Sequence, residues 1–231
     1  TPKISDIIIR SSENIHMFDT PLLLSRNNGL SFEQKLVKRF MDIVISLVML
    51  IITSPFMLIT AVAIKLYDGG PVFFRQKRCT INGKEFYIHK FRSMIVDAEK
   101  EGEVIPATDD DERITPVGKV IRKTRLDELP QFIDILKGDM SVVGPRPERV
   151  EHVEQYTEEI PEFAYRLKVK AGLTGYAQIY GKYNTTAYDK LKLDLMYIQN
   201  YSILLDLKLI IMTVKIVFVK ESTEGFEDTK K

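Results

Sequence analysis

FMDIVISLVMLIITSPFMLITAVAIKLY occupies residues 40–67, and this stretch decides the class of fold. Its apolar character is interrupted only by Asp42, Lys65 and a few hydroxyl groups. A helix needs roughly 20 mainly apolar residues to cross a bilayer, so the stretch is long enough to do so. The simplest interpretation is therefore a single transmembrane helix.

Two features favour a different arrangement of this stretch. Ser54-Pro55 lies in its middle, and a proline removes a helix hydrogen bond and kinks or breaks the helix. Basic residues flank both ends, and such flanks tend to stay in the cytoplasm. We therefore predict a re-entrant helix hairpin that enters one leaflet, bends at Ser54-Pro55 and returns. The flanking cations are Lys35, Lys38, Arg39, Lys65, Arg75, Lys77 and Arg78.

The segments on either side have local signals of their own. Ser31 followed by Gln34 is the pattern of a capping box, which predicts that the helix begins there. Two aromatic-rich runs after residue 70 are separated by Asn82-Gly83, a strong signal for a β-hairpin. Apolar periodicity and punctuating glycine or proline predict further helices over residues 127–137, 147–156, 188–197 and 204–219.

The last of these helices carries Lys208 and Lys215 on one face. Two interpretations stay open for it: a buried core helix, or a helix in the membrane interface with its lysines towards the headgroups.

The domain organisation follows from these patterns. Residues 1–30 form a lead-in that we interpret as the remnant of an upstream domain, because the stretch is too short to hold a core and begins with threonine. Residues 31–67 form the predicted membrane hairpin, residues 68–220 a domain for which the motifs described below imply a catalytic role, and residues 221–231 a polar tail that we expect to be disordered.

Composition excludes some classes of function. Lys plus Arg number 33 and Asp plus Glu number 32, a balance that gives no reason to expect a nucleic-acid partner. Cys79 is the one cysteine, so neither an intrachain disulfide nor a thiolate metal cluster can form. A cytosol-facing location fits this composition.

The richest cluster of chemical groups is RKTRLDELPQ at residues 122–131. Asp127 and Glu128 are adjacent carboxylates at the predicted start of a helix, with cations close by in the sequence. We expect the helix terminus and the cations to lower the carboxylate pKa. An ionised aspartate near a metal can attack phosphorus, whereas the simpler interpretation is a helix cap.

A second segment strengthens the catalytic interpretation. GDMSVVGPRP at residues 138–147 holds Arg146 between two prolines, and an arginine can grip phosphate oxygens with two parallel hydrogen bonds. The N–H groups of the helix predicted to begin at Pro147 would also face an anion. A tight turn with a surface arginine is the alternative.

Four motifs in order resemble the monotopic phosphoglycosyl transferases, the bacterial sugar transferase family. They are KFRSM at 90–94, LDELPQ at 126–131, KGDMSVVGPRP at 137–147 and GLTG at 172–175. The resemblance covers about residues 31–219. It implies an α+β fold, in which a re-entrant helix broken at Ser54-Pro55 and amphipathic interfacial helices surround a compact catalytic domain with a small β-hairpin or sheet.

The resemblance also implies a reaction. Asp127 would attack the sugar-bearing phosphate of a UDP-sugar and release UMP, and polyprenyl (undecaprenyl) phosphate would then accept the sugar phosphate. Asp127 and Glu128 would be the catalytic residues and would hold Mg²⁺. Arg146, Arg122, Lys90 and Arg92 are the candidate phosphate-binding residues. Such a reaction is the first membrane step in building a bacterial surface glycan.

Location and alternatives complete the prediction. We expect insertion among the lipids at the cytoplasmic face of the bacterial inner membrane, and a homodimer is possible by resemblance to longer family members. A non-catalytic scaffold of glycan assembly and a Mg²⁺-dependent membrane phosphohydrolase are the alternative functions. The sequence does not identify the donor sugar.

Overall fold

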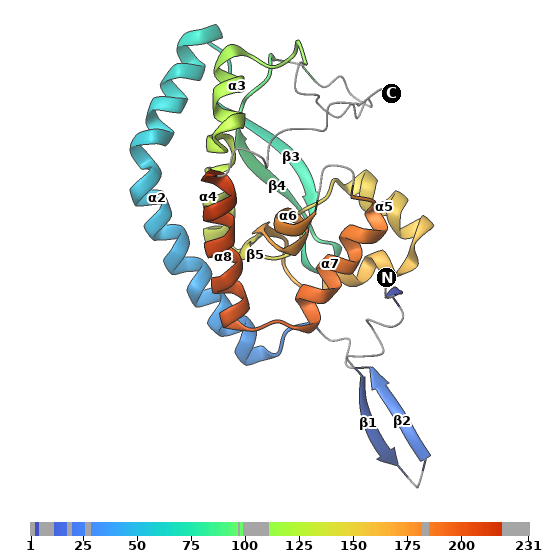
Figure 1. Cartoon of the computed structure of the whole chain (residues 1–231). Helices are drawn as coiled ribbons and strands as arrows, with labels where there is room; N and C mark the ends of the chain where they lie inside the picture. The colour runs from blue at the N-terminus through green and yellow to red at the C-terminus, as the bar shows by residue number, and fades with distance from the viewer. Residues whose placement is uncertain are drawn as a thin grey trace, which may run out of the picture.

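The computed structural model describes residues 3–4, 12–17, 20–25, 29–96, 98, 111–181 and 185–218. Helix α2 (Phe32–Asp68) runs along one flank of the molecule, and Figure 1 shows helices α4 (Gln131–Lys137) and α8 (Ile203–Phe218) on its inner side. The described strands form three two-stranded sheets. The fold is therefore mixed α and β with small sheets, as predicted.

Helix α2 begins where the sequence predicts. The Ser31 side chain accepts a hydrogen bond from Gln34 N, and the Gln34 side chain accepts one from Ser31 N, which completes the capping box. Gly69 ends the helix with a positive φ of 69°, the left-handed conformation that glycine adopts without strain.

The expected hairpin break at Ser54-Pro55 is not shown, because α2 continues through Pro55 as one helix, drawn as a curved ribbon in Figure 1. Pro55 has no N–H to donate to Ile51 O, four residues earlier. The Ser54 hydroxyl donates to that carbonyl instead, at 2.9 Å. This local substitution explains how the helix tolerates the proline.

The outer face of α2 is apolar and exposed. Among the described residues, α2 is the helix long and apolar enough to cross a membrane, and 11% of its most apolar window is buried. A soluble core helix of this composition would be mostly covered, so the face is suited to lipid. Its large exposed side chains include Phe40, Ile51, Ile52, Leu58 and Leu66.

Two buried polar contacts fix the inner face of α2 to the domain. Lys38 Nζ lies 2.5 Å from Asp206 Oδ2 of α8, and both side chains are less than a tenth exposed. Asp42 accepts hydrogen bonds from Ser141 Oγ and Val142 N, each at 2.9 Å. Since Ser141 begins strand β5 (Ser141–Val143), α2 is tied to both α8 and a small sheet.

The predicted β-hairpin is confirmed. Strands β3 (Phe73–Cys79) and β4 (Glu85–Phe91) pair antiparallel. The turn between them contains the short 3₁₀ helix η1 (Ile81–Gly83), in which Asn82 has φ 58° and Gly83 has φ 72°. Asparagine and glycine are the residues that adopt this left-handed conformation most readily, which is why Asn-Gly marks the turn.

The helix predicted over 127–137 is divided in two. A 3₁₀ helix, η2 (Leu126–Glu128), precedes α4, and Pro130 lies between them. Pro130 has no N–H to donate to Leu126 O, so the α-helical pattern cannot begin earlier. Helix α4 ends at Gly138, as predicted, with φ 95°.

The remaining elements surround this centre. Strand β5 pairs in parallel with β6 (Gly172–Thr174). The helix predicted from Pro147 begins three residues later, at Val150, so the N–H groups expected at Pro147 do not belong to a helix. The other elements are α3 (Pro116–Lys123), α5 (Val150–Glu159), η3 (Pro161–Lys168), α6 (Tyr176–Tyr180) and α7 (Ala187–Gln199).

Helix α8 is partly buried, and its position in a membrane interface stays a prediction. Leu209 and Asp206 are buried in the domain, whereas Leu204, Ile211 and Val214 are exposed. One face therefore packs on the core, and the other extends the apolar surface of α2.

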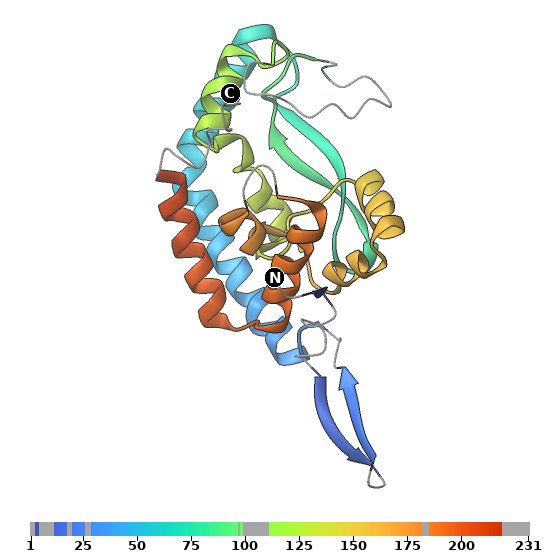
Figure 2. The same cartoon turned by 45° about the vertical axis from the view of Figure 1, so that its right-hand side comes forward.

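Ile4, near the start of the chain, is buried against the domain, and its N–H donates to Tyr188 OH. Strands β1 (Ser12–Met17) and β2 (Thr20–Ser25) pair as an antiparallel hairpin that stands clear of the other elements in Figures 1 and 2. The prediction that residues 1–30 are the remnant of an upstream domain stays a prediction. The predicted tail at 221–231 lies outside the described residues.

The buried Lys38–Asp206 pair makes a testable contribution to stability. We expect Asp206→Ala to leave a buried ammonium without its carboxylate, at a cost of about 3–5 kcal/mol in free energy of unfolding. Thermal unfolding in detergent should show a lower midpoint, by roughly 2–4 °C for each kcal/mol lost.

Glu85→Ala is the matched control, because it removes a carboxylate from an exposed pair with Lys77. Its unfolding temperature should stay at the wild-type value. Equal unfolding temperatures for the two variants would contradict the proposed importance of the buried pair.

Candidate active site

A basic pocket of about 450 Å³ lies between the β3–β4 hairpin and η2. Among the described residues that line it, Asp127 is the acidic one. Cationic walls attract a ligand with several negative charges, so the pocket suits an anion such as a diphosphate. The lining cations are Arg75, Arg78, Lys90, Arg92, Arg113, Arg122 and Arg149.

Glu128 is held between two cations. Its Oε1 lies 2.8 Å from Lys90 Nζ and 3.2 Å from Arg146 Nη2. Burial would raise the pKa of the Glu128 carboxyl, but Lys90 and Arg146 together outweigh burial and hold the pKa well below its ordinary value. Glu128 is therefore an ionised carboxylate that fixes two candidate phosphate-binding residues.

Asp127 behaves in the opposite way. Burial raises the pKa of its carboxyl, and the neighbouring charge of Glu128 adds to that effect. Lys90 and the two arginines at 122 and 125 oppose the rise without cancelling it. The expectation of a lowered pKa was wrong for Asp127, because the sequence shows the cations but not the burial.

The backbone at this site is strained. Arg125 precedes η2 with φ 58° and ψ 15°, a left-handed conformation that is uncommon for residues other than glycine, asparagine and aspartate. Strained backbone of this kind persists where the surrounding structure fixes it, often at functional sites. Here the conformation of Arg125 turns the chain from the end of α3 into η2, which carries Asp127 and Glu128.

The backbone of the loop that carries Arg146 is held in place by a buried arginine and by a close glycine contact. Arg166 Nη2 donates to Arg146 O at 2.8 Å, and Arg166 Nε donates to Asp194 at 2.8 Å in a buried ion pair. Gly144 and Gly172 lie so close that a Cβ on Gly172 would be 2.1 Å from Gly144 N. Arg146 thus extends from a rigid backbone.

The structure brings most of the predicted residues together. Asp127, Lys90, Arg122 and Arg92 line one pocket, and Glu128 joins Lys90 to Arg146. Sequence analysis missed Arg113 and Arg149 of the pocket and the Arg166–Asp194 support. Arg166 and Asp194 are 28 residues apart and carry no motif, so nothing in the sequence pairs them.

The sequence model of a family described as bacterial sugar transferase matches residues 33–220. The chain belongs to the bacterial sugar transferase family. It is 46% identical over 213 residues to the UDP-glucose:undecaprenyl-phosphate glucose-1-phosphate transferase of Klebsiella pneumoniae. The matched region covers 90% of this chain and 44% of that protein.

Two further relatives support this membership. The UDP-N-acetylgalactosamine-undecaprenyl-phosphate N-acetylgalactosaminephosphotransferase of Aeromonas hydrophila is 46% identical over 78% of this chain and 43% of its own length. The uncharacterized sugar transferase EpsL of Bacillus subtilis is 40% identical over 82% of this chain and 91% of its own length. The chain spans less than half the length of the first two relatives.

The acidic residues of the site bear on the Mg²⁺ that the sequence resemblance implies. Among the described residues, no three His, Cys, Asp or Glu side chains form a metal-binding group. Asp127 and Glu128 are adjacent carboxylates beside the pocket. Mg²⁺ is commonly held by one or two carboxylates together with substrate phosphates. Asp127 fits such an ion, whereas Glu128 Oε1 already contacts Lys90 and Arg146, which leaves Glu128 Oε2 as its oxygen for a metal.

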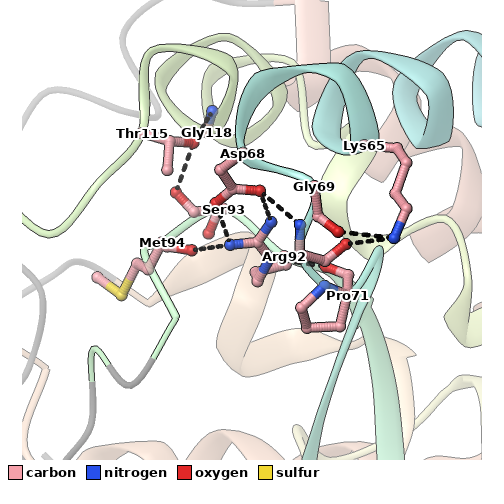
Figure 3. Close-up of polar contacts among 10 residues, drawn as sticks. Lys65, Asp68, Gly69, Pro71, Arg92, Ser93, Met94, Thr115 and Gly118 are labelled. Carbon is pink, nitrogen blue, oxygen red and sulfur yellow. Dashed lines mark hydrogen bonds and ion pairs between the residues drawn. The ribbon is translucent and has the colours of Figure 1, made fainter.

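Arg92 has a structural role that its motif did not reveal. Its side chain is buried and forms a two-pronged ion pair with Asp68, the last residue of α2. Its Nε donates to Pro71 O at 2.6 Å, and Figure 3 shows these contacts at the junction of α2 and β4. The phosphate contact of Arg92 stays a prediction beside this structural role.

Replacing this arginine tests its structural role. Arg92→Lys keeps the charge but cannot make both the paired contact with Asp68 and the bond to Pro71, so we expect a lower unfolding temperature. Adding Asp68→Asn to that variant should lower it little further, because the shared contact is already lost.

Arg122→Lys is the control, since Arg122 lines the same pocket. Its unfolding temperature should match the wild type. Strict additivity of Arg92→Lys and Asp68→Asn would show that the ion pair does not stabilise the junction.

Proposed function

We propose that this chain transfers a sugar phosphate from a UDP-sugar to polyprenyl phosphate and releases UMP. The observation that carries the proposal is Asp127, the acidic side chain among the described residues of a pocket walled by cations. The names of the relatives from Klebsiella pneumoniae and Aeromonas hydrophila support the donor and acceptor classes. The identity of the sugar stays open, because these two relatives act on different sugars.

In the first step, an Asp127 oxygen attacks the phosphorus that bears the sugar. The bond from that phosphorus to the bridging oxygen breaks, and UMP leaves with the bridging oxygen and its electron pair. Lys90 and Arg122 offset the charge of the diphosphate, without which an anionic nucleophile could not approach. Ionised Glu128 keeps Lys90 and Arg146 in place.

In the second step, a phosphate oxygen of the lipid acceptor attacks the phosphorus of the aspartyl phosphosugar. The acyl phosphate bond to Asp127 breaks and the free carboxylate returns. The product is a polyprenyl diphosphosugar. Arg146 is positioned to contact a phosphate at this stage, because its guanidinium lies next to Glu128 and is partly exposed.

We propose that Asp127 and Glu128 hold Mg²⁺ together with phosphate oxygens of the donor. When bound, the ion would neutralise charge that develops on the transferring phosphate.

The proposal places the site at a membrane surface. The exposed apolar faces of α2 and α8 support insertion into one leaflet, and the basic flanks of α2 support the cytoplasmic face of the bacterial inner membrane. The re-entrant path of α2 belongs to this proposal. Homodimer formation stays a prediction from the sequence.

The covalent intermediate is directly testable. Enzyme incubated with UDP-sugar and no acceptor should gain the mass of a phosphosugar on the peptide that contains Asp127, and should release one burst of UMP per enzyme. Asp127→Asn should show neither, because an amide is a poor nucleophile.

The same experiment separates the alternative functions. Steady UMP release without acceptor would indicate a phosphohydrolase, and absence of both adduct and UMP would favour a scaffold. Product formation by Asp127→Asn at the wild-type rate would refute the proposed nucleophile.

The pH dependence of adduct formation tests the electrostatics of the pair. Lys90 lowers the pKa of both carboxyls. Lys90→Gln removes that effect, so the pKa of Asp127 rises and a smaller fraction is ionised at a given acidic pH. The acidic limb of the pH–rate profile should therefore move to higher pH.

Lys84→Gln is the control, because Lys84 pairs with Asp139, which is not among the residues lining the pocket. It should leave the profile in place. An acidic limb that stays unchanged in Lys90→Gln would mean that Asp127 is not the titrating group.

A further inference from the structure

A second pocket lies on the other side of the carboxylate pair. It has a volume of about 420 Å³, within the range of small-molecule sites. Residues from α2, β6, α6 and α8 form apolar walls. The side chains that define these walls are Ile45, Met49, Leu173, Ile179, Ile210 and Val214.

The two pockets meet at consecutive residues. Asp127 lines the basic pocket and Glu128 lines the apolar one, and no described residue lines both. Lys90 belongs to the first pocket and Arg146 to the second, and both contact Glu128 Oε1. The two adjacent carboxylates therefore lie at the boundary between the pockets.

The apolar pocket continues onto the proposed membrane surface. Val214 of α8 lines the pocket and is itself exposed. Its neighbour on the same helix, Ile211, is 70% exposed and belongs to the outer face. An aliphatic chain would therefore remain in apolar surroundings on its way from lipid to the carboxylate pair.

One polar side chain in the pocket has no partner. Gln178 lines the pocket, and its Nε2 and Oε1 are buried without a hydrogen bond to any residue that the structure describes. A buried amide without partners costs free energy, and a turn of the side chain towards the pocket would let a ligand supply those partners. Its N–H groups can donate to phosphate oxygens.

We propose that this apolar pocket binds the phosphate end of the isoprenoid acceptor, with its first isoprene units between α2 and α8 and its phosphate near Arg146 and Gln178. The inference rests on the proposed function and deepens it. A nucleotide sugar does not suit these walls, because its many polar groups would lack partners there. Donor and acceptor then enter by separate routes and meet at Asp127.

A bulky residue at the rim tests the assignment. Purified protein in detergent is titrated with undecaprenyl phosphate, and binding is measured for the wild type and for Val214→Trp. We expect binding to weaken by about tenfold, or about 1.4 kcal/mol, in the variant. Ile211→Trp adds the same side chain on the exposed face of the same helix and should bind as the wild type does.

A second variant tests the phosphate end. Gln178→Glu places a negative charge in the pocket and should weaken binding of undecaprenyl phosphate, whereas its unfolding temperature shows whether the fold is intact. Wild-type affinity in both Val214→Trp and Gln178→Glu, or no binding by the wild type, would overturn the inference. Lipid binding that is lost as expected, in an enzyme that forms no phosphosugar adduct, would instead refute the proposed reaction and leave the pocket assignment standing.

Discussion

The attachment of α2 to the domain is the constraint on which the rest depends. The exposed outer face of α2 is uniformly apolar, so it does little to fix the rotation of the helix about its axis. Lys38 and Asp42 supply two polar points on the inner side, and they contact α8 and β5. Because β5 leads directly into the loop of Arg146, the position of the helix and the position of this candidate phosphate-binding residue are set by the same contacts.

The adjacent carboxylates illustrate how environment divides labour between similar groups. Glu128 is ionised and forms ion pairs with Lys90 and Arg146, whereas burial raises the pKa of the Asp127 carboxyl. A less solvated carboxylate is a better candidate for nucleophile, and a firmly paired one is a better candidate for holding cations in place. The side chains differ by one methylene group, so their surroundings must create the difference.

The sequence predicted what local rules control. The capping box at Ser31, the Asn82-Gly83 turn and the end of α4 at Gly138 are each decided within a few residues, and all are present. The sequence-based predictions failed where the outcome depends on residues far apart in the chain or on a side chain that replaces a lost backbone hydrogen bond. Burial of Asp127 depends on the whole fold, and the hydroxyl of Ser54 repairs the gap that Pro55 makes, which a proline rule alone cannot anticipate.

The contact between Gly144 and Gly172 restricts which positions of the two loops can be changed. Any side chain at either position would meet backbone, which cannot move aside as a side-chain tip can. In a mutant library that randomises the two loops, variants that replace either glycine are therefore expected not to fold.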